Sequence, residues 1–439
     1  MSLLLASELL DEKLRPIARA QNLSFRTISE LGGEVSLEEN ETVELPTLSL
    51  DRRAMILYTS GTTGRPKGAV STHANMTAHM ESLVEAWNWD SQDHILHVLP
   101  LHHTHGVVNA LCCALYSGAT VEFSRPEATQ CWDRFASGEV TVFMAVPTIY
   151  SKLLHAWEQA DDFTRARWTK GAAKLRLMVS GSAALPVSIF ERWKSVTGHD
   201  LLERYGMTEI GMGLSNPYAG ERRPGTVGQP LPSVDLRIFN PESHKVLAEG
   251  LHAIEEGASG EIQVRGPMVF SEYWGRPNDT AASFEDGWFR TGDEAVLEEG
   301  YYRILGRRSV DILKSGGYKI SAVEIEEVLR SHPAVQDCAV VGLPCEEWGE
   351  RVAAAVVVEP GASLLPDRIL SGQEGPDARS KAVKSILDGW SRERLAPYKV
   401  PRAWLCLDGL PRNAMGKIQK PAVQDLFAAH GEGPFEVSR

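Results

Sequence analysis

Residues 58–70 read Tyr-Thr-Ser-Gly-Thr-Thr-Gly-Arg-Pro-Lys-Gly-Ala-Val, and this stretch decides the fold. The apolar run at residues 54–58 predicts a buried strand, and residues 71–76 begin a helical pattern with a hydroxyl at the cap position. A loop of glycines and hydroxyls between a strand and a helix can cradle phosphates, with positive charge from Lys67 and Arg65. The loop is not a Walker A sequence, which ends in Gly-Lys-Ser/Thr. An ordinary flexible turn is the alternative, but it needs only one or two glycines.

Length, composition and charge limit the classes of protein. A chain of 439 residues predicts at least two domains, and 43% apolar with 23% charged residues is typical of a globular protein. The net charge of −13 argues against a general surface for nucleic acid or anionic membranes. Six scattered cysteines without a Cys-x-x-Cys pair favour a reducing compartment.

The ends of the chain lack a clear targeting signal. The first ten residues are apolar but have neither a basic segment nor a small-residue cleavage site, and the chain does not end in Ser-Lys-Leu. No stretch approaches the roughly 20 apolar residues of a membrane span. These features predict a cytoplasmic protein, with a mitochondrial or peroxisomal location left open.

The hydrophobic pattern predicts an α/β fold. Strand-like apolar runs at residues 95–99, 119–123, 141–146 and 175–179 alternate with amphipathic helices, which indicates helix-covered parallel sheets. Short, turn-bounded strands between residues 234 and 305 indicate a small β-subdomain. Further along, helices at 321–331 and 381–395 and strands at 335–341 and 351–358 predict a small α+β domain. We therefore divide the chain into a large domain, residues 1–306, and a small C-terminal domain, residues 307–439.

The loop at residues 58–70 resembles the phosphate-binding signature of the adenylate-forming superfamily, which includes acyl-CoA synthetases, luciferases and peptide-synthetase adenylation domains. The resemblance implies that ATP phosphates are held by Thr59, Ser60, Gly61, Thr62, Thr63, Gly64 and Lys67. Members of the superfamily normally have a further βα subdomain before this loop. The large domain is therefore expected to be N-terminally shortened and to expose apolar surface.

Residues 204–209, Arg-Tyr-Gly-Met-Thr-Glu, resemble the Tyr-Gly-x-Thr-Glu motif of the same superfamily. The resemblance implies that Thr208 contacts the α-phosphate, that Glu209 holds Mg²⁺ with Thr63, and that Tyr205 packs against adenine. The alternative is a turn in which Glu209 caps a helix.

Residues 288–293, Trp-Phe-Arg-Thr-Gly-Asp, resemble the ribose motif, because a carboxylate on a tight turn can accept hydrogen bonds from both ribose hydroxyls. This implies that Asp293 binds the ribose, with Arg307 as its partner. Many members carry Asp or Lys as a hinge residue two positions after that arginine. Ser309 stands there in this chain, so the hinge residue is left open.

The last two motifs lie in the expected small domain. Lys314, Gly316 and Gly317 belong to a segment that resembles the thioester-forming loop, where the pantetheine thiol of CoA would approach; the alternative is a solvated basic loop before a helix. Residues 410–418, Leu-Pro-Arg-Asn-Ala-Met-Gly-Lys-Ile, resemble the catalytic-lysine motif. The resemblance implies that Lys417 neutralises charge between the carboxylate and the α-phosphate, and that a mobile C-terminal domain rotates between two half-reactions.

Five histidines gather between residues 93 and 106: His94, His97, His102, His103 and His105. No cysteine or carboxylate pair completes a zinc ligand set, so the histidines are expected to bind main-chain groups in a strand and turn. Residues 99–106 also resemble the acid-pocket motif of the superfamily, which aligns His103 with the histidine of that motif.

Three segments resemble the malonyl-CoA synthetase branch: residues 202–209, residues 180–185, which include Ser182, and residues 220–228. Malonate has a second carboxylate, and burying it without a cation would cost several kcal/mol. Arg204 is the first candidate for this cation and Arg222 the second. A salt bridge from Arg204 to Glu203 or Glu221 is the alternative.

Taken together, the motifs imply an ATP-dependent acid–CoA ligase that uses ATP, Mg²⁺ and CoA and forms an acyl-adenylate before the thioester. Malonate or methylmalonate is the expected acid. A CoA ligase for a fatty or aryl acid is the second hypothesis, and a shortened, inactive paralogue that binds nucleotide is the third. The expected partners are small molecules, without nucleic acid or a membrane segment, and the oligomeric state is left open.

Overall fold

The computed structural model describes residues 3–6, 11–27, 47–59, 66–359, 376–412 and 418–430. The chain divides into two compact units, Met1–Ser49 and Leu50–Arg439. In the first unit, β1 (Leu3–Ala6) pairs in parallel with β2 (Ser24–Thr27), and α1 (Asp11–Ala20) lies between them in sequence.

A seven-stranded sheet in the order β11-β10-β9-β8-β7-β5-β6 forms the centre of the second unit. Five of its strands are parallel: β5 (His94–His97), β6 (Thr120–Phe123), β7 (Val142–Ala145), β8 (Leu177–Ser180) and β9 (Leu202–Met207). Two antiparallel strands, β10 (Gly211–Ser215) and β11 (Gln229–Pro230), extend it. The four strands predicted between residues 95 and 179 are confirmed to within two residues, and so is their parallel arrangement.

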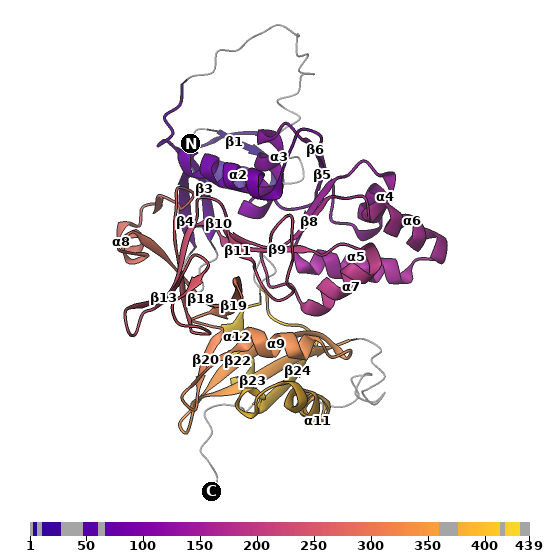
Figure 1. Cartoon of the computed structure of the whole chain (residues 1–439), viewed down its shortest axis with the longest axis vertical. Coiled ribbons are helices and arrows are strands. Elements are labelled where there is room, and N and C mark those ends of the chain that lie inside the picture. Colours follow the sequence, from indigo (N-terminus) through magenta and orange to yellow (C-terminus); the bar gives the residue numbers. More distant parts are fainter. Residues whose placement is uncertain are drawn as a thin grey trace. The chain divides into compact units, whose positions relative to one another are not determined.

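Helices cover both faces of this sheet. One face carries α4 (Ala128–Ser137), α5 (Pro147–Gln159), α6 (Asp162–Ala172) and α7 (Val187–Thr197), which gather beside the sheet in Figure 1. The other face carries α2 (His73–Trp87), the π-helix η3 (His105–Cys112) and α3 (Cys113–Tyr116). All residues of β7 and β8 are therefore buried, which explains why these strands read as continuous apolar runs.

The predicted β-subdomain is an antiparallel sheet in the order β14-β13-β12-β15-β18-β17, with β19 also paired to β18. Its strands are β12 (Asp235–Asn240), β13 (Lys245–Glu249), β14 (His252–Ala253), β15 (Ser259–Arg265), β17 (Phe284–Glu285), β18 (Trp288–Glu298) and β19 (Tyr301–Arg307). The pairing of β18 with β19 sets Asp293 opposite Arg307.

The structure corrects the prediction around the phosphate loop. β3 (Arg53–Thr59) pairs with β4 (Lys67–Thr72), and β16 (Glu272–Tyr273) completes a three-stranded sheet. β3 is an edge strand, with Ile56 40% and Tyr58 63% exposed, so the prediction of a buried strand is wrong. The predicted strand–loop–helix order is also wrong, because β4 lies between the loop and α2. The helix start is confirmed, with Thr72 as N-cap and a capping box to Asn75.

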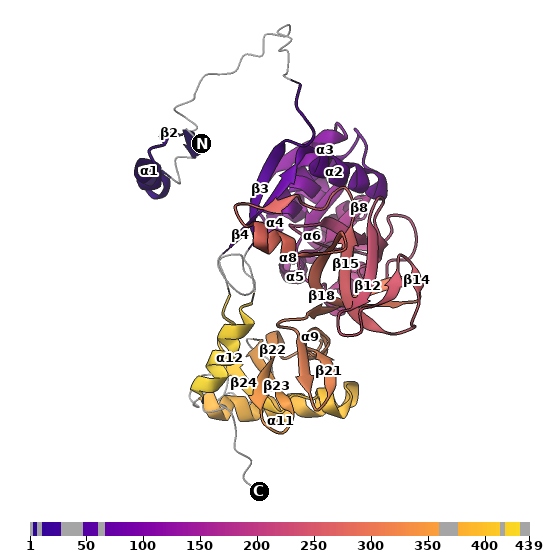
Figure 2. The same ribbon diagram turned by 90° about the vertical axis from the view of Figure 1, so that its left-hand side faces the viewer.

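The C-terminal residues build a five-stranded sheet with its own hydrophobic cores (Figures 1 and 2). The strands are β20 (Ile312–Ser315), β21 (Tyr318–Ser321), β22 (Val335–Cys345), β23 (Gly349–Val358) and β24 (Ala403–Leu407). Helices α9 (Ala322–Arg330) and α11 (Pro376–Arg394) pack on one face and α12 (Lys420–Ala429) on the other. The helices and strands expected here are confirmed, whereas the domain boundary at residue 306 stays a prediction.

Two short helices complete the described part of the chain, α8 (Pro277–Ala282) and the 3₁₀-helix η4 (Pro397–Lys399). Among the described residues, no helix is long and apolar enough to span a bilayer. All six cysteines are free thiols.

Candidate active site

Asp293 is the centre of the candidate ribose site. Its Oδ2 accepts a hydrogen bond from Tyr205 Oη at 2.6 Å, and its Oδ1 accepts one from Arg307 Nε at 2.9 Å. Burial opposes the charge on Arg307, but Asp293 outweighs it and raises the pKa of the guanidinium. Burial, together with Asp293, also raises the pKa of Tyr205 well above its usual value. The structure thus brings together the three residues that the sequence motifs placed at the nucleoside.

Glu209 lies in the turn between β9 and β10, so it does not cap a helix. Its Oε1 accepts a hydrogen bond from Tyr273 Oη at 2.8 Å, and burial raises the pKa of the Glu209 carboxyl. The Lys67 ammonium lies 5.0 Å from the centroid of the Tyr273 ring and 2.8 Å from Asp279 Oδ1. Tyr273 therefore connects the candidate metal ligand to the candidate phosphate-binding lysine.

The central part of the phosphate loop lies outside the described residues: Ser60, Gly61, Thr62, Thr63, Gly64 and Arg65. The catalytic candidate Lys417 also lies outside them. Thr59, at the end of β3, donates a weak hydrogen bond to Lys67 O at 3.4 Å and so helps to close the hairpin. Thr208 lines a small cavity together with His79, Thr104 and Gly211.

Arg204 and Ser182 meet at the candidate acid-binding end. Ser182 Oγ accepts a hydrogen bond from Arg204 Nη2 at 3.4 Å and lies 3.2 Å from His105 Nδ1. The backbone of Ser182 has a φ of +70°, a left-handed conformation that is rare for a residue with a side chain. His79 lies nearby, and burial, reinforced by the charge of Arg204, lowers its pKa to about 3. Burial likewise lowers the pKa of His105.

Arg204 is a buried cation that forms no ion pair with the described residues. Its exposed fraction is 4%, its Nε has no hydrogen-bond partner, and no carboxylate of the described residues forms an ion pair with it. Burial lowers its pKa to about 10, so the guanidinium stays charged at neutral pH. Burial raises the pKa of the neighbouring Glu203 to about 8, and Glu203 Oε1 accepts a hydrogen bond from Leu185 N at 2.8 Å. The salt bridge from Arg204 to Glu203 or Glu221 is therefore not formed.

Gly181 provides the space that the Arg204 guanidinium occupies. A Cβ at position 181 would lie 2.5 Å from Arg204 Cζ and 2.6 Å from its Nε. Real side-chain carbons do not approach other heavy atoms so closely, so the guanidinium needs a glycine beneath it.

The other two substrate candidates differ from Arg204. All three nitrogens of the Arg222 guanidinium donate to main-chain carbonyls, those of Pro217, Asp200 and Tyr218, at 3.1, 2.6 and 2.9 Å. This arrangement favours Arg204 as the cation for a substrate carboxylate. His103 is half-buried and packs against His102 with a ring-centroid distance of 4.3 Å, whereas His105 contacts Ser182.

The candidate CoA loop is a β-hairpin rather than an irregular loop. Gly316 and Gly317, at φ +57° and +82°, form the two-residue turn between β20 and β21, where both positions need the left-handed conformation. Lys314 is exposed on β20, and its main-chain N–H donates to Glu350 Oε2 at 2.6 Å.

Sequence reasoning did not single out His79, His105, Gly181 or Tyr273 as site residues. Gly181 and His105 do lie inside quoted motifs, but nothing in a motif shows which member faces Arg204. For a metal, Glu209 is the described candidate. Among the described residues, no group of three or more His, Cys, Asp and Glu is arranged to hold an ion. Mg²⁺ is usually held by one or two carboxylates with water and substrate phosphates, so this donor set fits it.

Comparison with known proteins agrees with the geometry. Residues 3–274 match the AMP-binding enzyme family, and residues 324–417 match the AMP-binding enzyme C-terminal domain. The chain is 51% identical over 395 residues to the mitochondrial malonate–CoA ligase ACSF3 of Mus musculus, covering 84% of this chain and 64% of that protein. It is 42% identical over 441 residues to malonate–CoA ligase of Arabidopsis thaliana, covering 96% and 69%. The chain thus spans about two thirds of the length of these relatives.

A solved structure shows the same fold. ATP-bound MatB from Rhodopseudomonas palustris has a TM-score of 0.80 at 34% identity, over 97% of this chain and 79% of that one. The predicted α/β architecture is confirmed. The chain belongs to the AMP-binding enzyme family, the adenylate-forming superfamily that its motifs resemble.

Proposed function

We propose that this protein is an ATP-dependent acid–CoA ligase whose acid is malonate or methylmalonate. The observation that carries the proposal is Arg204, a buried guanidinium with no carboxylate partner among the described residues. A dicarboxylate bound with one carboxylate at the reacting end supplies the missing anion with the other. Acids with an apolar tail leave Arg204 unpaired and are rejected. The names of the relatives support the same acid.

In the first half-reaction, a carboxylate oxygen of the acid attacks the α-phosphorus of ATP. The bond between that phosphorus and the bridging oxygen breaks, and pyrophosphate leaves. Tyr205 packs against adenine, Asp293 accepts from the ribose hydroxyls, and Arg307 holds the Asp293 carboxylate in place. Thr208 and Lys417 stabilise the negative charge that develops at the α-phosphate.

The phosphates of ATP are held by Lys67 and the loop residues from Thr59 to Gly64. Lys67 exchanges its contact with Asp279 for a phosphate oxygen. Glu209 and Thr63 hold Mg²⁺, which neutralises phosphate charge when bound. The raised pKa of Glu209 is consistent with a carboxylate that needs a nearby cation to be fully ionised.

In the second half-reaction, the thiol sulfur of CoA attacks the acyl carbon and the thiol loses its proton. AMP leaves with the electron pair of the acyl–oxygen bond, and a thioester forms. Lys314, Gly316 and Gly317 approach the pantetheine arm, and the glycine turn allows close contact because it has no side chains.

Pyrophosphate release by the purified 439-residue chain, measured with a panel of acids, tests the proposal. We expect malonate and methylmalonate to give much faster turnover than acetate, hexanoate or benzoate. Turnover with malonate no faster than with hexanoate or benzoate overturns the choice of acid and favours the fatty or aryl acid ligase. If none of the acids in the panel gives pyrophosphate release while ATP still binds, the inactive paralogue is favoured.

The cellular location of the protein is also part of the proposal. The name of the mouse relative favours the mitochondrial alternative over the predicted cytoplasmic location. Fluorescence of a C-terminally tagged full-length gene product, compared with a mitochondrial marker, tests this location.

A further inference from the structure

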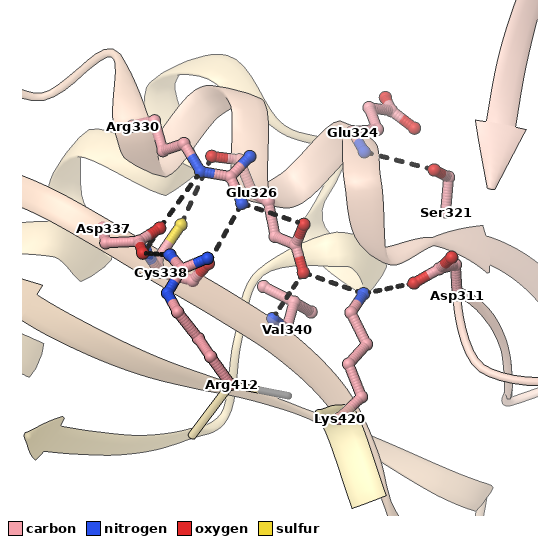
Figure 3. Close-up of polar contacts among 10 residues, drawn as sticks. All are labelled: Asp311, Ser321, Glu324, Glu326, Arg330, Asp337, Cys338, Val340, Arg412 and Lys420. Atoms are coloured by element: carbon pink, nitrogen blue, oxygen red, sulfur yellow. Dashed lines mark hydrogen bonds and ion pairs between the residues drawn. The ribbon is translucent and has the colours of Figure 1, made fainter. Parts of the chain in front are cut away.

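Lys420, the first residue of α12, is a buried cation held by two carboxylates (Figure 3). Its Nζ lies 2.8 Å from Glu326 Oε1 and forms a second ion pair with Asp311 Oδ1. The Lys420 side chain is 12% exposed. Burial opposes the charge on its ammonium, but Glu326 and Asp311 outweigh burial and raise its pKa. Lys420 therefore stays charged and bound.

Glu326, on α9, extends these contacts to β22. Its Oε1 also accepts from Val340 N at 2.8 Å, and its Oε2 accepts from Arg330 Nη2 at 3.2 Å. Arg330 Nε lies 3.7 Å from Asp337 Oδ1, and Asp337 also pairs with Arg412. Figure 3 shows this continuous set of alternating charges, which we name the stem network: Asp311, Lys420, Glu326, Arg330, Asp337 and Arg412.

Asp311 joins the stem network to the candidate nucleotide site. Its Oδ2 accepts from Arg307 N at 2.9 Å, and its main-chain N–H donates to Arg307 O at 2.7 Å. These two bonds close the turn that follows β19. The side chain of Arg307 pairs with Asp293, the candidate ribose ligand.

At the other end, the stem network holds both sides of the segment that carries Lys417. Arg412 and Ile418 form an isolated antiparallel bridge, and Gln419 N donates to Pro411 O at 2.9 Å. Before the Lys417 segment, Arg412 pairs with Asp337. After it, Lys420 directly follows Gln419 in the sequence. Lys420 follows Lys417 by three positions.

We propose that Lys420 is a positioning residue for acyl-adenylate formation. Its ion pairs with Asp311 and Glu326 tie the stem of the Lys417 segment to the turn after Arg307, and thereby to Asp293. The inference rests on the proposed function, because it takes Lys417 as the group that neutralises charge at the α-phosphate. Lys420 itself touches no substrate. Its contribution is the orientation of Lys417, and it is specific to the half-reaction that uses Lys417.

The test compares Lys420→Met with Lys399→Met in the full chain. Lys399 is a matched control, because its Nζ also pairs with a glutamate of α9, Glu324, at 2.6 and 2.7 Å, but it does not border the Lys417 segment. Each half-reaction is measured separately, with the acid that the wild type uses best and then with the preformed acyl-AMP and CoA. We expect Lys420→Met to lower kcat for acyl-adenylate formation about 100-fold, as small misplacements of a catalytic group do. We expect KM for ATP and thioester formation to stay unchanged, and Lys399→Met to change neither half-reaction.

Two further measurements keep the test decisive if Lys420→Met folds poorly or if the wild type is inactive. Lys420→Arg, which keeps the charge, is expected to restore most of the adenylation rate. Hydrogen exchange at the Gln419 amide is expected to be faster in Lys420→Met and in Glu326→Gln than in the wild type, with exchange of the β23 amides unchanged. Equal losses in both half-reactions, or unchanged exchange at Gln419, overturn the inference. Failure of malonate alone in the acid panel overturns only the choice of acid.

Discussion

Arg204 and Lys420 are both buried cations, yet their surroundings differ in the one respect that decides their roles. Lys420 contacts two carboxylates, and its pKa is raised. Arg204 contacts one hydroxyl, of Ser182, and its pKa is lowered to about 10. Both side chains remain charged at neutral pH, but of the two only Lys420 has a carboxylate partner among the described residues.

The difference separates a structural ion pair from a binding site. Removing a charge from water is costly, and a folded protein normally recovers part of the cost by pairing the charge. For Lys420 the partners are Asp311 and Glu326, and these two ion pairs orient the segment that precedes Lys420. For Arg204 no described carboxylate is such a partner, which is why we propose an acid with a second carboxylate as its ligand.

Arg204→Leu gives the largest expected effect on malonate use. Without the guanidinium, the second carboxylate of malonate is buried unpaired, which costs about 3–5 kcal/mol, or roughly a 10³-fold loss in kcat/KM. KM for ATP is expected to stay near the wild-type value, because the Arg204 side chain takes no part in the hydrogen bonds that join Asp293 to Tyr205 and Arg307. Steady-state pyrophosphate release measures both constants.

Arg222→Leu separates the two candidate cations in the same assay. Because Arg222 binds main-chain carbonyls, its loss is expected to lower stability without changing the preference for malonate over hexanoate. An unchanged malonate KM in Arg204→Leu, or a lost preference in Arg222→Leu, contradicts the assignment of Arg204.

The free energy of unfolding is expected to respond differently to the loss of each cation. Lys420→Met removes the cation that Asp311 and Glu326 share, and the other hydrogen bonds of these two carboxylates replace its charge only in part. The variant is expected to lower the free energy of unfolding by about 3 kcal/mol. Arg204→Leu removes an unpaired buried charge, so the free energy of unfolding is expected to stay equal or to rise. Urea denaturation at pH 7 measures both variants. If Arg204→Leu destabilises the protein as much as Lys420→Met, Arg204 has a structural partner in solution and the contrast fails.

The two regions also differ in how far the sequence predicts them. Asp293, Arg307 and Tyr205 lie within motifs. The pairing of β18 with β19 sets Asp293 opposite Arg307, and Tyr205 reaches Asp293 from β9 through its hydroxyl. The strands β7 and β8 were predictable because full burial on both faces selects continuous apolar residues. In contrast, β4 contains Gly68 and hydroxyl residues, and its pairing with β3 and β16 makes it a strand.

The contacts that decide the roles of the two cations are long-range. Lys420 stands beyond the end of a motif, and its partners Asp311 and Glu326 lie far upstream in the chain, so no local pattern indicates the ion pairs. His103 and His105 are close together in sequence, and the π-helix η3 determines which imidazole reaches Ser182. The need for a glycine at position 181 depends on the position of the Arg204 guanidinium, which comes from the neighbouring strand β9. These features follow from tertiary packing, which local propensity does not report.

Gly181→Ala sharpens the contrast by moving Arg204 without removing it. The added Cβ would lie 2.5 Å from Arg204 Cζ, and the flexible end of the arginine side chain can shift more easily than the backbone. We expect malonate KM to rise about tenfold, the range seen when one methyl group alters a pocket, with little change in thermal stability. Gly213→Ala is the matched control, because its Cβ would meet only Ile210 Cδ1, at 3.4 Å. Equal malonate KM values in the two variants contradict the role of Gly181.

Glu203 gives the smallest expected change in malonate KM, and it tests whether the charge around Arg204 depends on pH. Burial raises the pKa of Glu203 to about 8, above its value in the unfolded chain, and the nearby Glu327 acts in the same direction. The folded state therefore binds more protons than the unfolded state between about pH 4.5 and pH 8. The free energy of unfolding accordingly falls as the pH rises through this range, by at most about 1.4 kcal/mol per pH unit from this group.

Above pH 8, Glu203 ionises, and its charge attracts the neighbouring Arg204 guanidinium and repels the second carboxylate of malonate. We expect malonate KM in the wild type to rise between pH 7 and pH 9, by less than in Gly181→Ala. Glu203→Gln cannot ionise, so its malonate KM and its free energy of unfolding are expected to lose these pH dependences. Parallel pH profiles of KM in the wild type and in Glu203→Gln would mean that Glu203 does not compete for Arg204.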